Sequence, residues 1–141
     1  MTSHVLITGG SSGIGWETAK RGANITIMAR RADLLEEARA EIDAVRAGPV
    51  GETATFSVDV AALDQVDAAC AEAESKFGVA DVVVTSAGIA IPGYFEDLPL
   101  DNFRDHMEIN YFGTVNVLKA VLPAMRSRGD GHVALVSSGA G

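Results

Sequence analysis

The chain has 141 residues and a formal net charge of −8, a length that suits one domain with a core and is too short for two. So much negative charge repels phosphates, so we expect no nucleic-acid partner. The single cysteine, Cys70, excludes an internal disulfide and a cysteine-based metal cluster, and its place among alanines indicates a buried side chain rather than a nucleophile. No metal site is predicted. No apolar run of about 18 residues occurs, so no transmembrane segment is predicted.

Apolar, strand-like segments alternate with segments of helical periodicity along the chain. The predicted strands are residues 4–8, 24–29, 53–58, 81–85 and 132–137. The predicted helices are residues 14–21, 32–47, 62–77 and 100–128, the last with a bend near Gly113. This alternation predicts an α/β fold with a doubly wound parallel sheet, helices on both faces and strand order 3-2-1-4-5. Ligands of such a sheet bind at the carboxyl ends of its strands.

A glycine-rich turn, Thr8-Gly-Gly-Ser-Ser-Gly-Ile-Gly15, joins the first strand to the first helix. Glycine lets the backbone turn sharply and approach a ligand that a Cβ would obstruct, and the helix amino terminus favours an anionic pyrophosphate. Glycine spacing alone would also fit an ordinary turn, but strand, turn and helix in this order predict a dinucleotide site. Its predicted cofactor-binding residues are Gly9, Ser11, Ser12, Gly13, Ile14 and Gly15.

Two arginines follow the second predicted strand. When the ligand is NAD, this strand normally ends in a carboxylate that accepts hydrogen bonds from the ribose 2′-hydroxyl. Here Ala29 occupies that position and Arg30 and Arg31 come next. A guanidinium pairs with a 2′-phosphate, which a carboxylate would repel. Although two solvated arginines at a helix start are the simpler alternative, the pattern favours NADP(H).

The ends of the third and fourth strands carry further candidate cofactor contacts. Asp59 is predicted to hydrogen-bond the adenine amino group, with Val60 as an apolar wall. Asp59 also suits a cap for the helix that begins near residue 61, and the two interpretations are compatible. Ala87 and Gly88 offer a close approach to the cofactor because they have little or no side chain.

Several collinear segments resemble the short-chain dehydrogenase/reductase family over the whole chain. They are the glycine turn 8–15, Asp59-Val60, Ala87-Gly88, Asn110 within residues 107–114, and Ser138 after Val136-Ser. The resemblance implies one NADP(H)-binding, Rossmann-type domain over residues 1–141. More narrowly, segments 4–15, 87–98 and 109–114 resemble the 3-ketodihydrosphingosine reductases, which use NADPH to reduce the ketone of a long-chain sphingoid base in sphingolipid synthesis.

The resemblance implies a catalytic role for Ser138 and Asn110. Hydride would pass from the nicotinamide to a ketone carbon, and Ser138 would hydrogen-bond the oxygen that develops negative charge. Asn110 would hold a water in a proton relay through a backbone distortion of its helix. A tyrosine would deliver the proton, helped by a lysine four residues later that lowers its pKa. Without the resemblance, Asn110 fits a helix kink and Ser138 a polar turn.

The chain departs from the family pattern in three places. The Tyr-x-x-x-Lys pair belongs roughly a dozen residues after Ser138, and neither Tyr94 nor Tyr111 has a lysine at that spacing. The 141 residues alone are therefore expected to be an incomplete domain without activity, lacking the last strands of the family. The first helix is about one turn shorter than in relatives. Thr85-Ser86 stands where the family has asparagine, so hydroxyls would only partly replace its bridge between strands.

The leading functional hypothesis is NADPH-dependent reduction of a lipid ketone, 3-ketosphinganine, to a secondary alcohol. The alternatives are a 3-oxoacyl reductase or another short-chain alcohol dehydrogenase and, in a different class, a non-catalytic dinucleotide-binding module. The family suggests a homo-oligomer, for which the 100–128 helix supplies an apolar stripe that must also cover the sheet. The predicted stripe consists of Val115, Leu118, Val121, Leu122 and Met125. Cysteine usage fits a cytoplasmic location, with membrane association of the complete protein left open.

Overall fold

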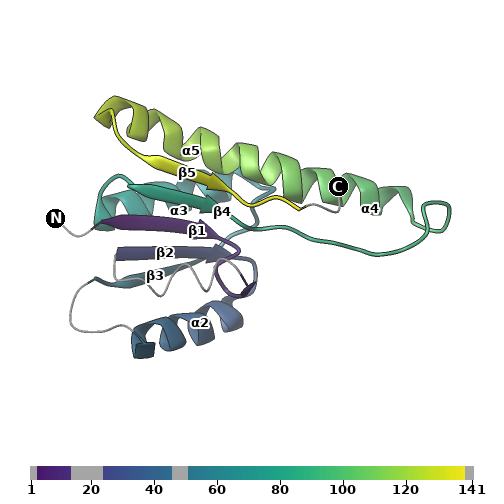
Figure 1. The fold of residues 1–141 in the computed structure, drawn as a ribbon, viewed down its shortest axis with the longest axis horizontal. Helices are drawn as coiled ribbons and strands as arrows, with labels where there is room; N and C mark the ends of the chain where they lie inside the picture. The colour runs from purple at the N-terminus through teal and green to yellow at the C-terminus, as the bar shows by residue number, and fades with distance from the viewer. Residues whose placement is uncertain (1–2, 14–23, 46–50, 139–141) are drawn as a thin grey trace.

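One parallel five-stranded sheet organises the molecule, and its strand order is β3-β2-β1-β4-β5 (Figure 1). The computed structural model describes residues 3–13, 24–45 and 51–138. The strands are β1 His4–Thr8, β2 Asn24–Ala29, β3 Thr53–Ser57, β4 Val82–Thr85 and β5 His132–Leu135. All four neighbouring pairs run parallel. The predicted order is confirmed, and the chain reverses its direction of winding between β1 and β4, where an open sheet of this type forms its ligand crevice.

The helices cover the two faces of this sheet. They are α2 Ala32–Val45, α3 Leu63–Phe77, α4 Leu100–His106 and α5 Gly113–Arg128, with a π-helix, η1 Met107–Phe112, between α4 and α5. In Figure 1 α2 lies on one side of the sheet and α5 on the other. The predicted bend in the long helix is a π-helical turn that ends just before Gly113. The predicted first helix, residues 14–21, lies outside the described residues.

Two apolar cores lie on opposite faces, because successive side chains of a strand point to opposite sides of a sheet. On the α2 face, strand residues such as Ile7 and Ile27 pack against Leu35, Ala38 and Ile42, whose spacing gives α2 one apolar face. On the other face, the cluster consists of Leu6, Met28, Val58, Val60, Val66, Ala69, Cys70, Ala80, Val83, Val117, Val121 and Met125. Because the inner strands are buried on both faces, their sequences are nearly continuous apolar runs.

Two apolar segments are wholly or partly exposed in the structure, and the second corrects a sequence expectation. All residues of β5 are exposed, whereas the other edge strand, β3, has buried residues and packs against α2. The predicted stripe on the long helix divides between two faces: Val121 and Met125 are buried against the sheet, whereas Leu122 points outward and is 43% exposed. None of the helices within the described residues combines the length and the apolar character needed to cross a bilayer.

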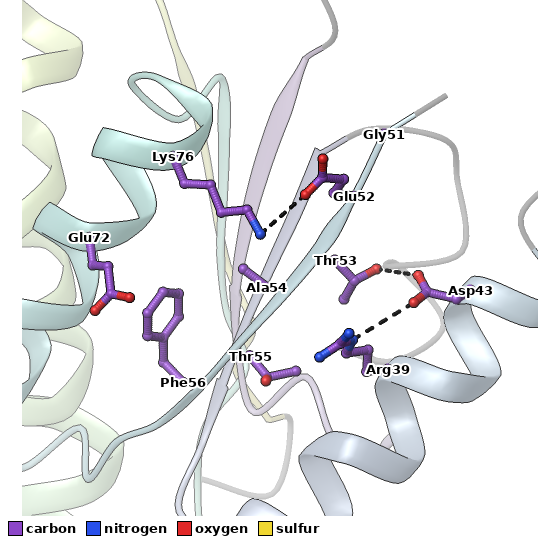
Figure 2. A pocket seen from close by; sticks show the side chains of 10 residues that line it. All are labelled: Arg39, Asp43, Gly51, Glu52, Thr53, Ala54, Thr55, Phe56, Glu72 and Lys76. Atoms are coloured by element: carbon purple, nitrogen blue, oxygen red, sulfur yellow. Dashed lines mark hydrogen bonds and ion pairs between the residues drawn. The ribbon is translucent and has the colours of Figure 1, made fainter. Parts of the chain in front are cut away.

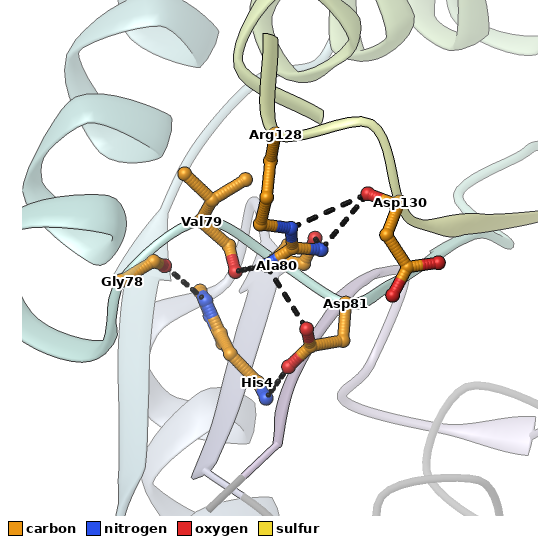
Figure 3. A network of polar contacts seen from close by, with 7 residues as sticks. All are labelled: His4, Gly78, Val79, Ala80, Asp81, Arg128 and Asp130. Carbon is orange, nitrogen blue, oxygen red and sulfur yellow. Dashed lines mark hydrogen bonds and ion pairs between the residues drawn. The ribbon is translucent and has the colours of Figure 1, made fainter. Parts of the chain in front are cut away.

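A polar network joins the amino-terminal end of the sheet to the end of α5 (Figure 3). The ring of His4 donates from Nδ1 to the Gly78 carbonyl at 2.8 Å, since a carbonyl can only accept, and Nε2 accepts from the Thr26 hydroxyl at 2.9 Å. Asp81 accepts from the backbone N–H of His4 at 2.7 Å and pairs with Arg128 at 2.9 Å. Burial lowers the pKa of His4, although the Gly78 carbonyl and Asp81 oppose that effect.

Candidate functional site

A groove of about 1210 Å³ opens at the carboxyl ends of the strands, as the topology predicts. It is lined by all the described residues that we predicted for the site: Gly9, Ser11, Ser12, Gly13, Arg30, Arg31, Asp59, Val60, Ala87, Gly88, Asn110 and Ser138. Ile14 and Gly15 lie outside the described residues. Residues 75 or more positions apart in the sequence therefore face one cavity, and this is the arrangement needed by a ligand that spans several strands.

The glycine turn packs directly on the end of β4. Gly9 has φ of 69°, and a Cβ there would lie 2.8 Å from backbone atoms of Ser86 and Ala87, so both the turn and the close approach require glycine. The hydroxyl of Thr8 accepts from the N–H groups of Ser86 and Ala87, each at 3.3 Å. Thr8 thus joins β1 to β4. The buried Thr85 hydroxyl, by contrast, has no hydrogen-bond partner among the described residues.

Arg30 and Arg31 line the groove where the chain leaves β2 for α2. Their backbone carbonyls are fixed: that of Arg30 accepts from the Ser57 hydroxyl at 2.9 Å, and that of Arg31 from the Leu35 N–H at 3.2 Å. Both side chains are exposed, and no ion pair joins either guanidinium to another described residue. Two positive groups on a fixed backbone are thus available at the groove for an anion.

Asp59 forms a tight turn rather than the predicted helix cap. Its carboxylate accepts from the Ala61 N–H at 3.0 Å, whereas α3 begins at Leu63 and its N-cap residue makes no side-chain cap bond. The same turn is held from α5, where Asn116 donates to the Val60 carbonyl at 2.9 Å. A Cβ on Gly113 would lie 2.6 Å from Cγ2 of Val60. The absent side chain at Gly113 therefore allows the helix to support the Asp59-Val60 end of the groove.

Asn110 lies within the π-helical turn and binds the segment that follows β4. Its Oδ1 accepts from the Ile89 N–H at 2.8 Å, and its Nδ2 donates to the Ile89 carbonyl at 2.9 Å. Its own carbonyl accepts from the Thr114 hydroxyl at 3.1 Å. The expected backbone distortion at Asn110 is present, because η1 spans Met107–Phe112. Its side-chain amide thus bonds the backbone of Ile89 at the edge of the groove.

Ser138 lies just beyond β5 and lines the groove. The tyrosines at 94 and 111 are 78% and 55% exposed, and neither is among the described residues that line it. Cys70 is buried in α3, where burial raises the pKa of its thiol to about 12. That thiol is therefore not ionised near neutral pH, which agrees with the prediction that Cys70 is structural.

A second pocket of about 510 Å³ lies beside edge strand β3 and has the wrong chemistry for an anionic ligand (Figure 2). Both of its cations are paired, Lys76 with Glu52 at 3.2 Å and Arg39 with Asp43 at 3.9 Å, and Glu72 adds a further negative charge. Thr53 also donates to Asp43 at 2.8 Å. The groove at the carboxyl ends of the strands is the better candidate because its arginines keep their charge available.

Sequence reasoning missed three residues that hold the groove in shape: Thr8, Asn116 and His106. His106 accepts from the Ile91 N–H, as described below. Each of these side chains binds the backbone of a segment that is distant in the sequence, so no local spacing of residues predicts the contact. The only available signals were a hydroxyl at the end of a buried strand and polar side chains near the inward-facing Gly113.

Comparison with known proteins decides the family. Residues 3–141 match the family model described as short chain dehydrogenase. The chain belongs to the short-chain dehydrogenase/reductase family. It is 39% identical to a 3-dehydrosphinganine reductase of Danio rerio and 41% identical to a 3-ketodihydrosphingosine reductase of Bos taurus, in both cases over 144 residues and 99% of this chain. The chain spans 43% of the length of each of these relatives.

Other relatives and solved structures carry different names. A dehydrogenase/reductase SDR family member 7B of Mus musculus is 38% identical over 95% of this chain and 43% of its own. NAD⁺-bound xylitol dehydrogenase superposes with a TM-score of 0.91 at 27% identity, over 99% of this chain and 54% of that one. An actinorhodin polyketide ketoreductase with NADPH gives 0.87 at 30% identity, over 97% and 53%. These names identify a family of oxidoreductases with a Rossmann-type fold and do not decide between the two nicotinamide cofactors.

Proposed function

We propose that the groove binds NADP(H) and that the protein reduces a lipid ketone to a secondary alcohol. The observation that carries the proposal is that one groove contains the glycine turn, two arginines without ion pairs to described residues, Asn110 and Ser138. The first two suit the phosphates of a dinucleotide, and the last two suit the chemistry of carbonyl reduction. As the chain covers less than half of its curated relatives, the activity of the whole protein is part of the proposal.

The chain's own residues fit this cofactor along the groove. The turn from Gly9 to Gly13 brings backbone N–H groups to the pyrophosphate. Arg30 and Arg31 bind the 2′-phosphate of the adenosine ribose, and Asp59 with the Val60 wall accommodates the adenine. Ala87 and Gly88 leave room for close approach at the end of β4. When bound, NADPH supplies the hydride.

Ser138 and Asn110 act at the other end of the groove. The Ser138 hydroxyl donates a hydrogen bond to the ketone oxygen, which gains the electron pair of the carbonyl π bond as the carbon accepts hydride. The proton for that oxygen would come from a tyrosine whose pKa is lowered by a lysine four residues later, as the family resemblance implies. Asn110 shapes the π-helical turn so that its backbone can hold a relay water, while its side chain fixes Ile89.

The substrate proposed first is 3-ketosphinganine, because two of the similar curated proteins carry that reductase name. The alternative substrate class is a 3-oxoacyl thioester. A solved 3-oxoacyl-[acyl-carrier protein] reductase of Brucella melitensis supports it, with a TM-score of 0.85 at 26% identity. Self-association through the outward face of α5, where Leu122 is exposed, is proposed as well, and light scattering on the purified protein measures it.

The test uses the protein encoded by the complete reading frame that carries these residues. We expect NADPH oxidation with 3-ketosphinganine to exceed that with a short 3-oxoacyl thioester. Ser138→Ala should lower kcat by roughly 10²–10³-fold, the usual effect of losing one donor to a developing oxyanion, with NADPH affinity retained. Ser127→Ala is the matched control, because Ser127 is exposed on α5 and does not line the groove. Turnover of the thioester but not of 3-ketosphinganine would identify a 3-oxoacyl thioester as the substrate. Cofactor binding without turnover of any ketone would indicate a non-catalytic module.

A further inference from the structure

The segment that follows β4 forms one rim of the groove and is held from the neighbouring helix. Ile89 and Ala90 line the groove, and the chain then runs outward past the ends of the strands before it returns through α4 (Figure 1). Asn110 binds both backbone groups of Ile89. His106 lies four positions before Asn110 in the sequence and binds the same segment two residues further on. Its Nε2 accepts from the Ile91 N–H at 3.1 Å.

The hydrogen bonds of His106 determine which of its nitrogens carries the proton. Nδ1 lies 2.6 Å from the Asn102 carbonyl, which can only accept, so Nδ1 is the protonated nitrogen. Nε2 then has a free lone pair and faces the Ile91 N–H. Both ring nitrogens are satisfied at once, and the half-buried imidazole acts as a rigid spacer between the backbone of α4 and the rim segment.

We infer that His106 is a positioning residue for the ketone end of the groove, acting with Asn110 as a two-point clamp on Ile89–Ile91. The two residues lie one helical turn apart and bind alternate residues of an extended segment, so together they fix both its distance from the helix and its direction. A single contact at Ile89 would leave the segment free to pivot. This inference rests on the proposed function in one respect: it takes the molecule that the rim segment contacts to be the ketone substrate.

Three substitutions separate the loop contact from the helix contact of the ring. Gln places an acceptor near the position of Nε2, so His106→Gln can keep the bond to Ile91. Asn places a donor near the position of Nδ1, so His106→Asn can keep the bond to Asn102 but does not reach Ile91. His106→Phe keeps the ring shape and loses both bonds. Arg104→Ala is the matched control, because Arg104 is an exposed residue of α4 that pairs with Asp101 at 2.9 Å.

The first readout is amide hydrogen exchange of Ile89, Ala90, Ile91 and Gly93, measured on the protein from the complete reading frame, and it needs no substrate. We expect exchange about fivefold faster in His106→Asn and His106→Phe, the effect of losing one net hydrogen bond. His106→Gln and Arg104→Ala should exchange like the unsubstituted protein. Unchanged exchange in the Asn and Phe variants would overturn the clamp, and a Gln variant that resembles Phe would show that the hydrogen bond is not what holds the segment.

The second readout is steady-state reduction of the ketone. Loss of the clamp should raise KM about fivefold and change kcat less than twofold, because the rim binds ground state and transition state alike. A general loss of fold would instead lower the fraction of active enzyme, and with it the apparent kcat, without raising KM. Equal KM values in all four variants would refute the link to substrate. If the unsubstituted protein reduces no ketone but exchange still responds as expected, the proposed function fails and the clamp stands.

Discussion

The two arginines after β2 provide the sharpest test of cofactor choice. Replacing Arg30 or Arg31 by alanine removes one guanidinium from the groove without disturbing a known ion pair, since neither pairs with a described residue. Charge-assisted hydrogen bonds are worth about 1.5–3 kcal/mol, but both side chains are exposed and screened by solvent, so we take about 1–2 kcal/mol for each. That range corresponds to roughly a 5- to 30-fold weaker Kd for NADPH.

NADH is the internal control for this prediction, because it lacks the 2′-phosphate. Its Kd should change less than about twofold in either variant, and added salt should weaken NADPH binding more than NADH binding. Arg39→Ala controls for a general loss of positive charge: Arg39 lies on α2 but pairs with Glu36 at 3.4 Å and faces the pocket beside β3. Fluorescence titration at fixed ionic strength measures all of these constants.

Two results would refute the reasoning behind NADP(H). One is that the unsubstituted protein binds NADH as tightly as NADPH. The other is that Arg30→Ala and Arg31→Ala weaken both cofactors equally, which would mean that the guanidiniums contact the shared pyrophosphate or act through the fold. In either case Ala29 at the end of β2 would no longer distinguish the cofactors.

Three further predictions concern the support of the groove and the far end of the sheet. Gly113→Ala places a Cβ 2.6 Å from Val60, so the free energy of unfolding should fall by about 1–3 kcal/mol in thermal unfolding, and NADPH binding should weaken. Unchanged values would mean that α5 shifts without effect on the site. Arg128→Met removes bonds to three carbonyls and to Asp81 from a partly exposed side chain and should cost about 1–2 kcal/mol by denaturant unfolding, whereas Arg126→Met should cost little. Burial lowers the pKa of His4 from its ordinary value of 6.5. Just below that pH the unfolded chain therefore binds more protons than the folded chain, so the free energy of unfolding should decrease as pH falls from 6.5. His4→Gln should flatten that dependence, and equal slopes would contradict the assignment.

The sheet order and the position of the site could be predicted from sequence for one physical reason. Parallel strands need helical crossovers of one hand, so the alternation of apolar and amphipathic segments leaves few topologies. The carboxyl ends of parallel strands lie on one edge, so the sequence alone predicts that Gly9, Arg30, Asp59 and Ser138 face one groove.

The supports of the groove could not be predicted in the same way. Asn116 donates to the Val60 carbonyl across 56 positions of sequence, and Asn110 binds Ile89 across 21. Side-chain bonds to backbone follow no period, and a polar residue on a helix looks the same in sequence whether it faces water or a loop. The exposure of β5 is not readable from its apolar run either: the predicted order places this strand at an edge, but composition does not show whether a helix covers it.

The long helix from Leu100 to Arg128 therefore has a larger role than covering the sheet. Asn116 and Gly113 fix the turn after β3, and Asn110 with His106 fixes the segment after β4. Thr8 ties that segment back to the glycine turn. The loops after β3 and β4 are thus held by contacts within the protein, so little of a ligand's binding free energy is lost in ordering them. Substitutions of Gly113 or Asn116 should consequently weaken cofactor binding by disturbing the turn after β3.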